Sequence, residues 1–189
     1  VDFKSPPSEI AELASMSMEL ISMEHWQAFF DNIEDLKRAK RQQLESVMDT
    51  LPWIAAIDKF QHWIYLNPKH SIKARYEEWT NIMKDFGSDV INYQGLENNL
   101  KRRWQVQLHL YEVPFYYIEY GFAQLGAIAM WRNYKTNAKR TIDQYKAALS
   151  LGYTKTIPEV YEAAGIKFDF SPEYVKELMD FVKGEYDGI

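Results

Sequence analysis

Apolar residues recur along most of this chain at the three- and four-residue spacing of amphipathic helices. The alternation of apolar and polar residues that marks a strand does not extend over a useful length. The pattern therefore predicts an all-α fold, an irregular assembly of about eight helices. The expected helices span about residues 5–30, 31–51, 52–66, 71–87, 104–110, 115–134, 137–151, 156–165 and 171–184, with a loop over residues 88–100.

Serine, proline and glycine set the predicted boundaries. Ser5, followed by two prolines, is a candidate cap for the first helix, and Ser71 and Ser171 are candidate caps for later ones. A new helix is expected to begin at about Pro52. Gly87 is expected to end the helix that Ser71 opens.

The first predicted helix is mostly apolar but carries carboxylates, as the stretch SEIAELASMSMEL shows. Glu12 and Glu19 are two turns apart and share a face, about 10 Å from one another along the axis, so they cannot both bind one metal ion. A carboxylate buried without a partner is costly, and acids that point inward therefore imply a cation, an arginine or a set of donors. The alternative is that these acids pair with lysine or arginine of another helix, or face water.

A second polar cluster lies in HLYEVPFYYIEYGF, which begins at His109. On a helix beginning near Pro114, Tyr116 and Tyr120 share a face, whereas Tyr117 points elsewhere. A phenol can donate a hydrogen bond to a developing oxyanion, and an imidazole can do the same or bind a substrate carbonyl. The alternative is that these tyrosines belong to the core, with satisfied hydroxyl groups.

Composition narrows the class of protein. Hydrophobic residues make up 47% and charged residues 26%, which is typical of a globular protein with a core. The net charge of −5, with a single basic run on a predicted helix, disfavours nucleic-acid binding. No segment approaches the ~20 apolar residues of a membrane span, so no membrane is expected. The absence of cysteine excludes disulfides and thiol nucleophiles, and the cytoplasm is the default expectation.

Several catalytic motifs are absent from the sequence. There is no H-E-x-x-H, no G-x-S-x-G and no phosphate-binding loop. No glutamate is followed three residues later by histidine, which disfavours a helical domain with a carboxylate-bridged di-metal site. Taken by themselves, the residues indicate an incomplete site that has acids and phenols.

Taken together, these segments resemble the C-terminal part of the thimet oligopeptidase and oligoendopeptidase F family of zinc metallopeptidases, over nearly the whole chain. SEIAELASMSMEL resembles the helix that carries the third zinc ligand, with the pattern E-x-x-S-x-x-x-E at Glu12, Ser15 and Glu19. HLYEVPFYYIEY resembles the histidine and tyrosine segment that lines the substrate cleft, and LSLGYTKTIPEVYEAAGIKFDF resembles the closing glycine loop and helix pair.

The resemblance implies a role for five residues. Glu12 would bind zinc, and Glu19 would hold the histidines of the metal site in orientation. His109 and Tyr120 would act on the substrate side, with Tyr120 donating to the tetrahedral oxyanion and Tyr116 as its neighbour in the cleft. The H-E-x-x-H of the family would supply two zinc ligands and the general base, and it would fall before the first residue of this chain.

The resemblance thus implies a zinc metalloendopeptidase that hydrolyses internal bonds of short peptides. Residues 1–189 would form a single helical unit, the C-terminal portion of a larger catalytic domain. With one candidate ligand and no general base, the 189 residues alone are expected to bind zinc weakly or not at all and to cleave no peptide. The alternative is a non-catalytic helical module that binds a peptide or a partner protein through its aromatic face. Exposed apolar surface could also drive formation of a homodimer.

Overall fold

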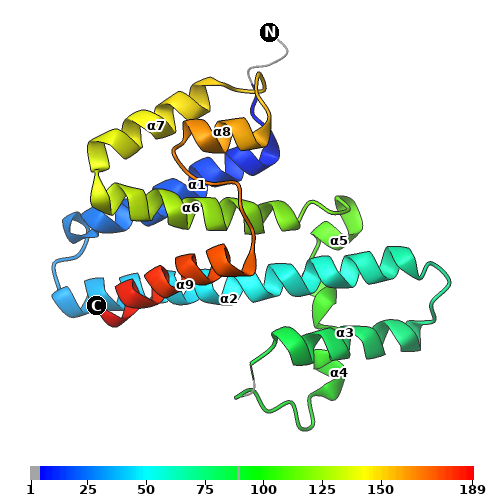
Figure 1. Ribbon diagram of the computed structural model, residues 1–189. Helices are drawn as coiled ribbons and strands as arrows, with labels where there is room; N and C mark the ends of the chain where they lie inside the picture. Colours follow the sequence, from blue (N-terminus) through cyan, green and yellow to red (C-terminus); the bar gives the residue numbers. More distant parts are fainter. Residues whose placement is uncertain (1–4, 89) are drawn as a thin grey trace. The chain divides into compact units, whose positions relative to one another are not determined.

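The computed structural model describes residues 5–88 and 90–189 (Figure 1). Within these residues every regular element is helical, which confirms the predicted all-α fold. No helix in this part of the chain has the length and apolarity needed to cross a bilayer. The elements in order are α1 (Ser8–Ser22), the 3-10 helix η1 (Met23–Ala28), α2 (Ile33–Leu66), α3 (Ile72–Phe86), α4 (Glu97–Leu100), the 3-10 helix η2 (Arg103–Val106), α5 (His109–Glu112), α6 (Ile118–Thr136), α7 (Ala138–Ser150), α8 (Ile157–Ala163) and α9 (Pro172–Asp187).

The serine caps and the glycine stop of the later helices are confirmed. The Ser71 hydroxyl accepts a hydrogen bond from the backbone N–H of Ala74 at the start of α3, and Gly87 directly follows the end of that helix. The Ser171 hydroxyl accepts from the backbone N–H of Tyr174 at the start of α9. Each cap satisfies one of the amide groups that a first helical turn leaves without a partner.

The predicted break at Pro52 is wrong, because α2 runs without interruption from Ile33 to Leu66. Proline removes one hydrogen bond from a helix interior, but Pro52 lies on an exposed side of α2, where water can reach the carbonyl that loses its partner. Buried side chains hold α2 on both sides of the proline, with Val47 before it and Ile54 and Ile57 after it. Burial of an apolar face therefore carries the helix through the proline, since such packing supplies most helical stability in proteins.

The first predicted helix is divided differently from the prediction. Pro7, not Ser5, precedes the first turn, and it makes no side-chain cap. After Ser22 the chain tightens from α1 into η1. The Ser22 hydroxyl donates to the carbonyl of Glu19 at 2.8 Å and accepts from the indole N–H of Trp26 at 3.0 Å. A serine that bonds to nearby groups in this way competes with the regular helical pattern.

The region between α3 and α6 is also more finely divided than the pattern predicts. The expected loop over 88–100 contains the short helix α4, and the expected helix over 104–110 is split into η2 and α5. Gln107, between these two elements, has an extended backbone with φ −86° and ψ 93°, which no helical turn can include.

Contacts within the chain group the residues into two compact units. The first unit comprises the residues up to Met48 together with Phe122–Ile189, and in it α1 contacts α7 and α8. A Cβ atom on Gly126 of α6 would lie 2.7 Å from Leu13 Cδ1 and 3.1 Å from the hydroxyl oxygen of Tyr161. A larger residue at position 126 would therefore require the side chains of Leu13 and Tyr161 to move.

The second unit comprises Asp49–Gly121 and has an aromatic core. The rings of Phe60 and Trp79 have their centroids 5.2 Å apart, and those of Phe60 and Trp104 are 5.3 Å apart. The indole N–H of Trp79 donates to the carbonyl of Leu100 at 2.9 Å, so that α3 holds the segment that contains α4. The core residues are Ala56, Ile57, Phe60, Trp79, Ile82, Met83 and Trp104.

Tyr161 provides a test of the first unit through its pH dependence. Its side chain is fully buried, its hydroxyl donates to the carbonyl of Phe122 at 3.0 Å, and burial, with a smaller effect of the Glu9 carboxylate, raises the pKa of Tyr161. Because the folded-state pKa lies above the unfolded value of about 10, this contribution to stability is complete below pH 10 and is lost as the pH rises toward the folded-state pKa.

We expect Tyr161→Phe to lower the free energy of unfolding by about 1–2 kcal/mol at pH 7, because the Phe122 carbonyl loses its donor. Above pH 10 the variant should lose less stability with pH than the wild type does. Urea unfolding across this pH range measures both effects, and Tyr153→Phe, at a residue that is 55% exposed, is the control. An unchanged alkaline slope in Tyr161→Phe would contradict the assignment.

Candidate functional site

Two faces of α1 carry different residues. The buried face consists of apolar side chains and one serine, whereas Glu12 is half-buried and Glu19 is exposed. The helical repeat places both acids beside the apolar stripe and not in it. The Ser15 hydroxyl donates to the backbone carbonyl of Glu12 at 3.0 Å. The buried residues are Ile10, Leu13, Ser17, Leu20 and Ile21.

The described part of the chain contains no group of three or more histidine, cysteine, aspartate or glutamate side chains that could hold a metal ion. A catalytic zinc ion needs three protein ligands. Glu12 thus offers one carboxylate, and the residues in hand do not by themselves fit a complete zinc site. Glu19 lies two turns further along the same helix, as the sequence predicts.

The turn before α6 differs from the prediction. The long helix begins at Ile118 and not near Pro114, because Phe115 adopts a left-handed backbone with φ 61°. This conformation cannot belong to a right-handed helix. The Phe115 ring lies 4.9 Å from the ring of His62 and 5.0 Å from that of Tyr65, between centroids.

His109 and three tyrosines nevertheless gather into one cluster. The rings of Tyr116 and Tyr120 contact each other with centroids 5.5 Å apart, although Tyr116 precedes α6 and the expected common helical face does not form. Tyr116 also stacks on His109, with centroids 5.8 Å apart and ring planes inclined by 18°. His109 Nε2 lies 3.3 Å from the hydroxyl oxygen of Tyr120. The structure thus brings together three of the predicted site residues, His109, Tyr116 and Tyr120.

Tyr117 belongs to the same cluster, so the prediction that it points elsewhere is wrong. Its ring lies 5.0 Å from that of His109 and 5.4 Å from that of Tyr120, between centroids. The helical spacing on which the prediction depended does not apply, because Tyr117 precedes the first residue of α6. Burial raises the pKa of Tyr117, and the nearby indole of Trp53 partly offsets that rise.

Two further residues complete the surroundings of His109, and the sequence analysis missed both. The indole N–H of Trp53 donates to Gln107 Oε1 at 3.0 Å, and Gln107 Nε2 lies 2.7 Å from His109 Nδ1. Gln107 is two residues before His109, whereas Trp53 lies in α2. No spacing in the sequence indicates that residues so far apart meet at one histidine.

Tyr111 lies outside this cluster and stacks on Trp104, with centroids 6.0 Å apart.

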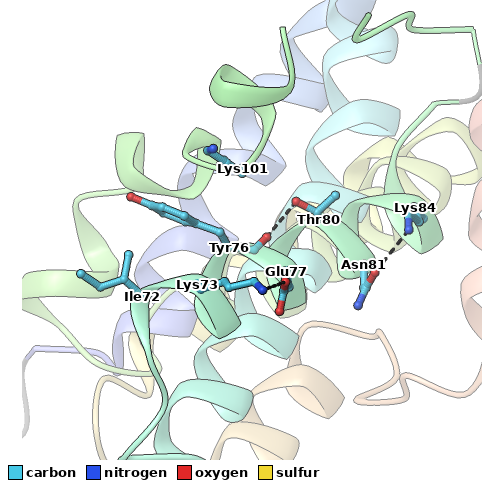
Figure 2. Close-up of a pocket in the computed structure, with 8 residues that line it drawn as sticks. All are labelled: Ile72, Lys73, Tyr76, Glu77, Thr80, Asn81, Lys84 and Lys101. Carbon is cyan, nitrogen blue, oxygen red and sulfur yellow. Dashed lines mark hydrogen bonds and ion pairs between the residues drawn. The ribbon is translucent and has the colours of Figure 1, made fainter.

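A groove of about 720 Å³ runs along α3, and Figure 2 shows its lining residues, with Tyr76 and Lys101 above the ion pair of Lys73 and Glu77. None of the five predicted site residues lines this groove. Of the predicted residues, Glu12 and Glu19 belong to the first unit and the His109 cluster to the second.

The sequence model of peptidase family M3 matches residues 2–180. The chain therefore belongs to peptidase family M3, in agreement with the resemblance seen in its α1 and His109 segments. No curated protein matches the chain.

Solved structures of peptidases resemble the chain closely. A protein assigned as an oligoendopeptidase F matches 98% of the chain with a TM-score of 0.87 and 29% identity, and another, from Bacillus anthracis, matches 100% with a TM-score of 0.78 and 26% identity. PZ peptidase A, solved with an inhibitor, matches 100% with a TM-score of 0.87 and 28% identity. The chain spans 32%, 30% and 33% of these three chains, about a third of their length.

Proposed function

We propose that this chain is the C-terminal portion of the catalytic domain of a zinc-dependent endopeptidase that hydrolyses internal bonds of short peptides. The observation that carries the proposal is the hydrogen bond between His109 and Tyr120 within a cluster of tyrosines, in a chain of peptidase family M3. Family membership favours this function over a non-catalytic helical binding module.

The cluster supplies the donors that peptide hydrolysis requires on the substrate side. Attack on a peptide carbonyl produces a tetrahedral oxyanion, and a donor fixed in advance at that position lowers the barrier. The Tyr120 hydroxyl, whose oxygen lies 3.3 Å from His109 Nε2, is the proposed donor to the oxyanion. Tyr116 stacks on the imidazole and keeps its ring plane fixed. Tyr117 packs against both His109 and Tyr120 and limits their movement.

Glu12 is proposed as one ligand of the zinc ion and Glu19 as the acid that orients the other ligands. Both carboxylates lie off the buried stripe of α1, and the stretch E-x-x-S-x-x-x-E that contains them resembles the family's helix with the third zinc ligand. A catalytic zinc ion, when bound, lowers the pKa of its water to about 7 and polarises a substrate carbonyl. The remaining ligands would come from the rest of a protein of which this chain is a portion.

Cleavage of short peptides by the full-length protein tests this function. We expect turnover of internally quenched peptides, cleavage at internal bonds as read by mass spectrometry, and complete loss of turnover after treatment with a chelator. Zinc added back should restore the activity, and magnesium serves as the control ion. Turnover that a chelator leaves unchanged would contradict the zinc dependence. Binding of peptides without any cleavage would favour the helical binding module.

A further inference from the structure

The hydrogen bonds around His109 form a chain whose direction is fixed at one end. Trp53 Nε1 carries a proton and can only donate, so the amide atom of Gln107 that faces it must be the oxygen. The nitrogen of the same amide then faces His109 Nδ1 at 2.7 Å and donates to it. Nδ1 must accept, and the proton of a neutral His109 is therefore on Nε2.

Trp53 is well placed to hold this amide. Its ring lies edge-on to Trp79 with centroids 5.5 Å apart, and the guanidinium carbon of Arg103 lies 4.9 Å from its ring centroid. Trp79 is fully buried in the core of the second unit. A rotation of the Gln107 amide by half a turn would place two N–H donors against each other, and this opposes the rotation.

We propose that Gln107, held by Trp53, is a positioning residue that keeps His109 in the tautomer with its proton on Nε2. His109 then donates through Nε2 to the hydroxyl oxygen of Tyr120 at 3.3 Å. In this series of hydrogen bonds from Trp53 to Tyr120, every donor points toward Tyr120. Hydrogen bonds aligned in this manner polarise one another, and the hydroxyl of Tyr120 becomes a stronger donor toward a substrate oxyanion.

The tautomer of His109 in the full-length protein tests the proposal directly. Imidazole 15N signals from protein labelled at histidine distinguish the two tautomers, and loss of one signal in His109→Gln assigns the residue. We expect the Nε2-protonated form in the wild type. In Gln107→Glu the carboxylate still accepts from Trp53 but cannot donate, so a proton should move to Nδ1 of His109. In Trp53→Phe the amide can rotate, and both tautomers should be populated.

Gln105→Glu is the matched control, because Gln105 is exposed and the substitution adds the same charge two residues away. Its His109 signals should equal those of the wild type. A wild-type His109 with its proton on Nδ1, or a Gln107→Glu variant with the proton still on Nε2, would overturn the proposal.

The effect on catalysis rests on the proposed function, whereas the tautomer does not. We expect Gln107→Glu to lower kcat for peptide cleavage about tenfold with a smaller change in KM. A factor of this size corresponds to the loss of one hydrogen bond at the transition state. If the tautomer changes and kcat does not, the role of Gln107 in positioning stands and the catalytic role of His109 fails. If the tautomer itself is unchanged, the positioning role fails whatever the activity.

Discussion

The substitution Glu12→Gln should strip zinc from the full-length protein and lower kcat/KM for peptide cleavage by more than about a hundredfold. Residues that only support a metal ligand typically cost about 10–100-fold when they are replaced, and the loss of a ligand should exceed that. The fold should persist, because Glu12 is half-buried and lies off the apolar stripe by which α1 packs.

Metal analysis by atomic emission, together with circular dichroism, measures the two expected effects of Glu12→Gln. The control is Glu9→Gln, an identical change one turn earlier on the same helix, which should retain both zinc and activity. Normal zinc content in Glu12→Gln would remove Glu12 from the metal site.

The substitution Tyr120→Phe should lower kcat about 10²–10³-fold while zinc content and KM stay close to the wild-type values. That range is typical for the removal of a single donor to an oxyanion. The ring contacts of Tyr120 with His109 and Tyr116 are retained by phenylalanine, so the change isolates the hydroxyl group.

Tyr116→Phe is the comparison for this experiment, since the proposal gives Tyr116 a role through its ring, which stacks on His109. Its effect on kcat should be less than about tenfold. A Tyr120→Phe enzyme with wild-type kcat, or a Tyr116→Phe enzyme that loses more activity than Tyr120→Phe, would contradict the assignment of the oxyanion donor.

Local sequence rules were sufficient for much of the helical framework. Ser71, Ser171 and Gly87 mark helix ends through groups that act within one turn, and the structure confirms all three. The expected break at Pro52 is absent, because burial of apolar side chains on both sides outweighs one missing hydrogen bond. Cap chemistry is local and can be predicted, whereas the continuation of a helix depends on a balance over many residues.

The candidate site was predicted only in part. The His109 cluster follows from a dense local motif, and His109, Tyr116 and Tyr120 do meet. Tyr117 was misplaced because the left-handed backbone of Phe115, a residue with no intrinsic preference for that conformation, delays the helix. The roles of Glu12 and Glu19 stay predictions that depend on the resemblance to the family.

Gln107 and Trp53 could not have been found from the sequence. Their meeting with His109 depends on how the segment before α5 packs against α2, which is a property of the tertiary structure. A glutamine near a histidine is common, and it indicates nothing until an indole N–H fixes which way its amide points.

The left-handed turn at Phe115 has a consequence for how a peptide would meet the tyrosines. A non-glycine residue in this conformation costs about 1–2 kcal/mol, and the contacts of its ring with His62 and Tyr65 offset a cost of that size. The backbone is thus bent into place when the chain folds. In the proposed peptidase, a peptide would find the turn already ordered, and the association need not supply the entropy of arranging it. The ordering cost of binding would then fall on the peptide.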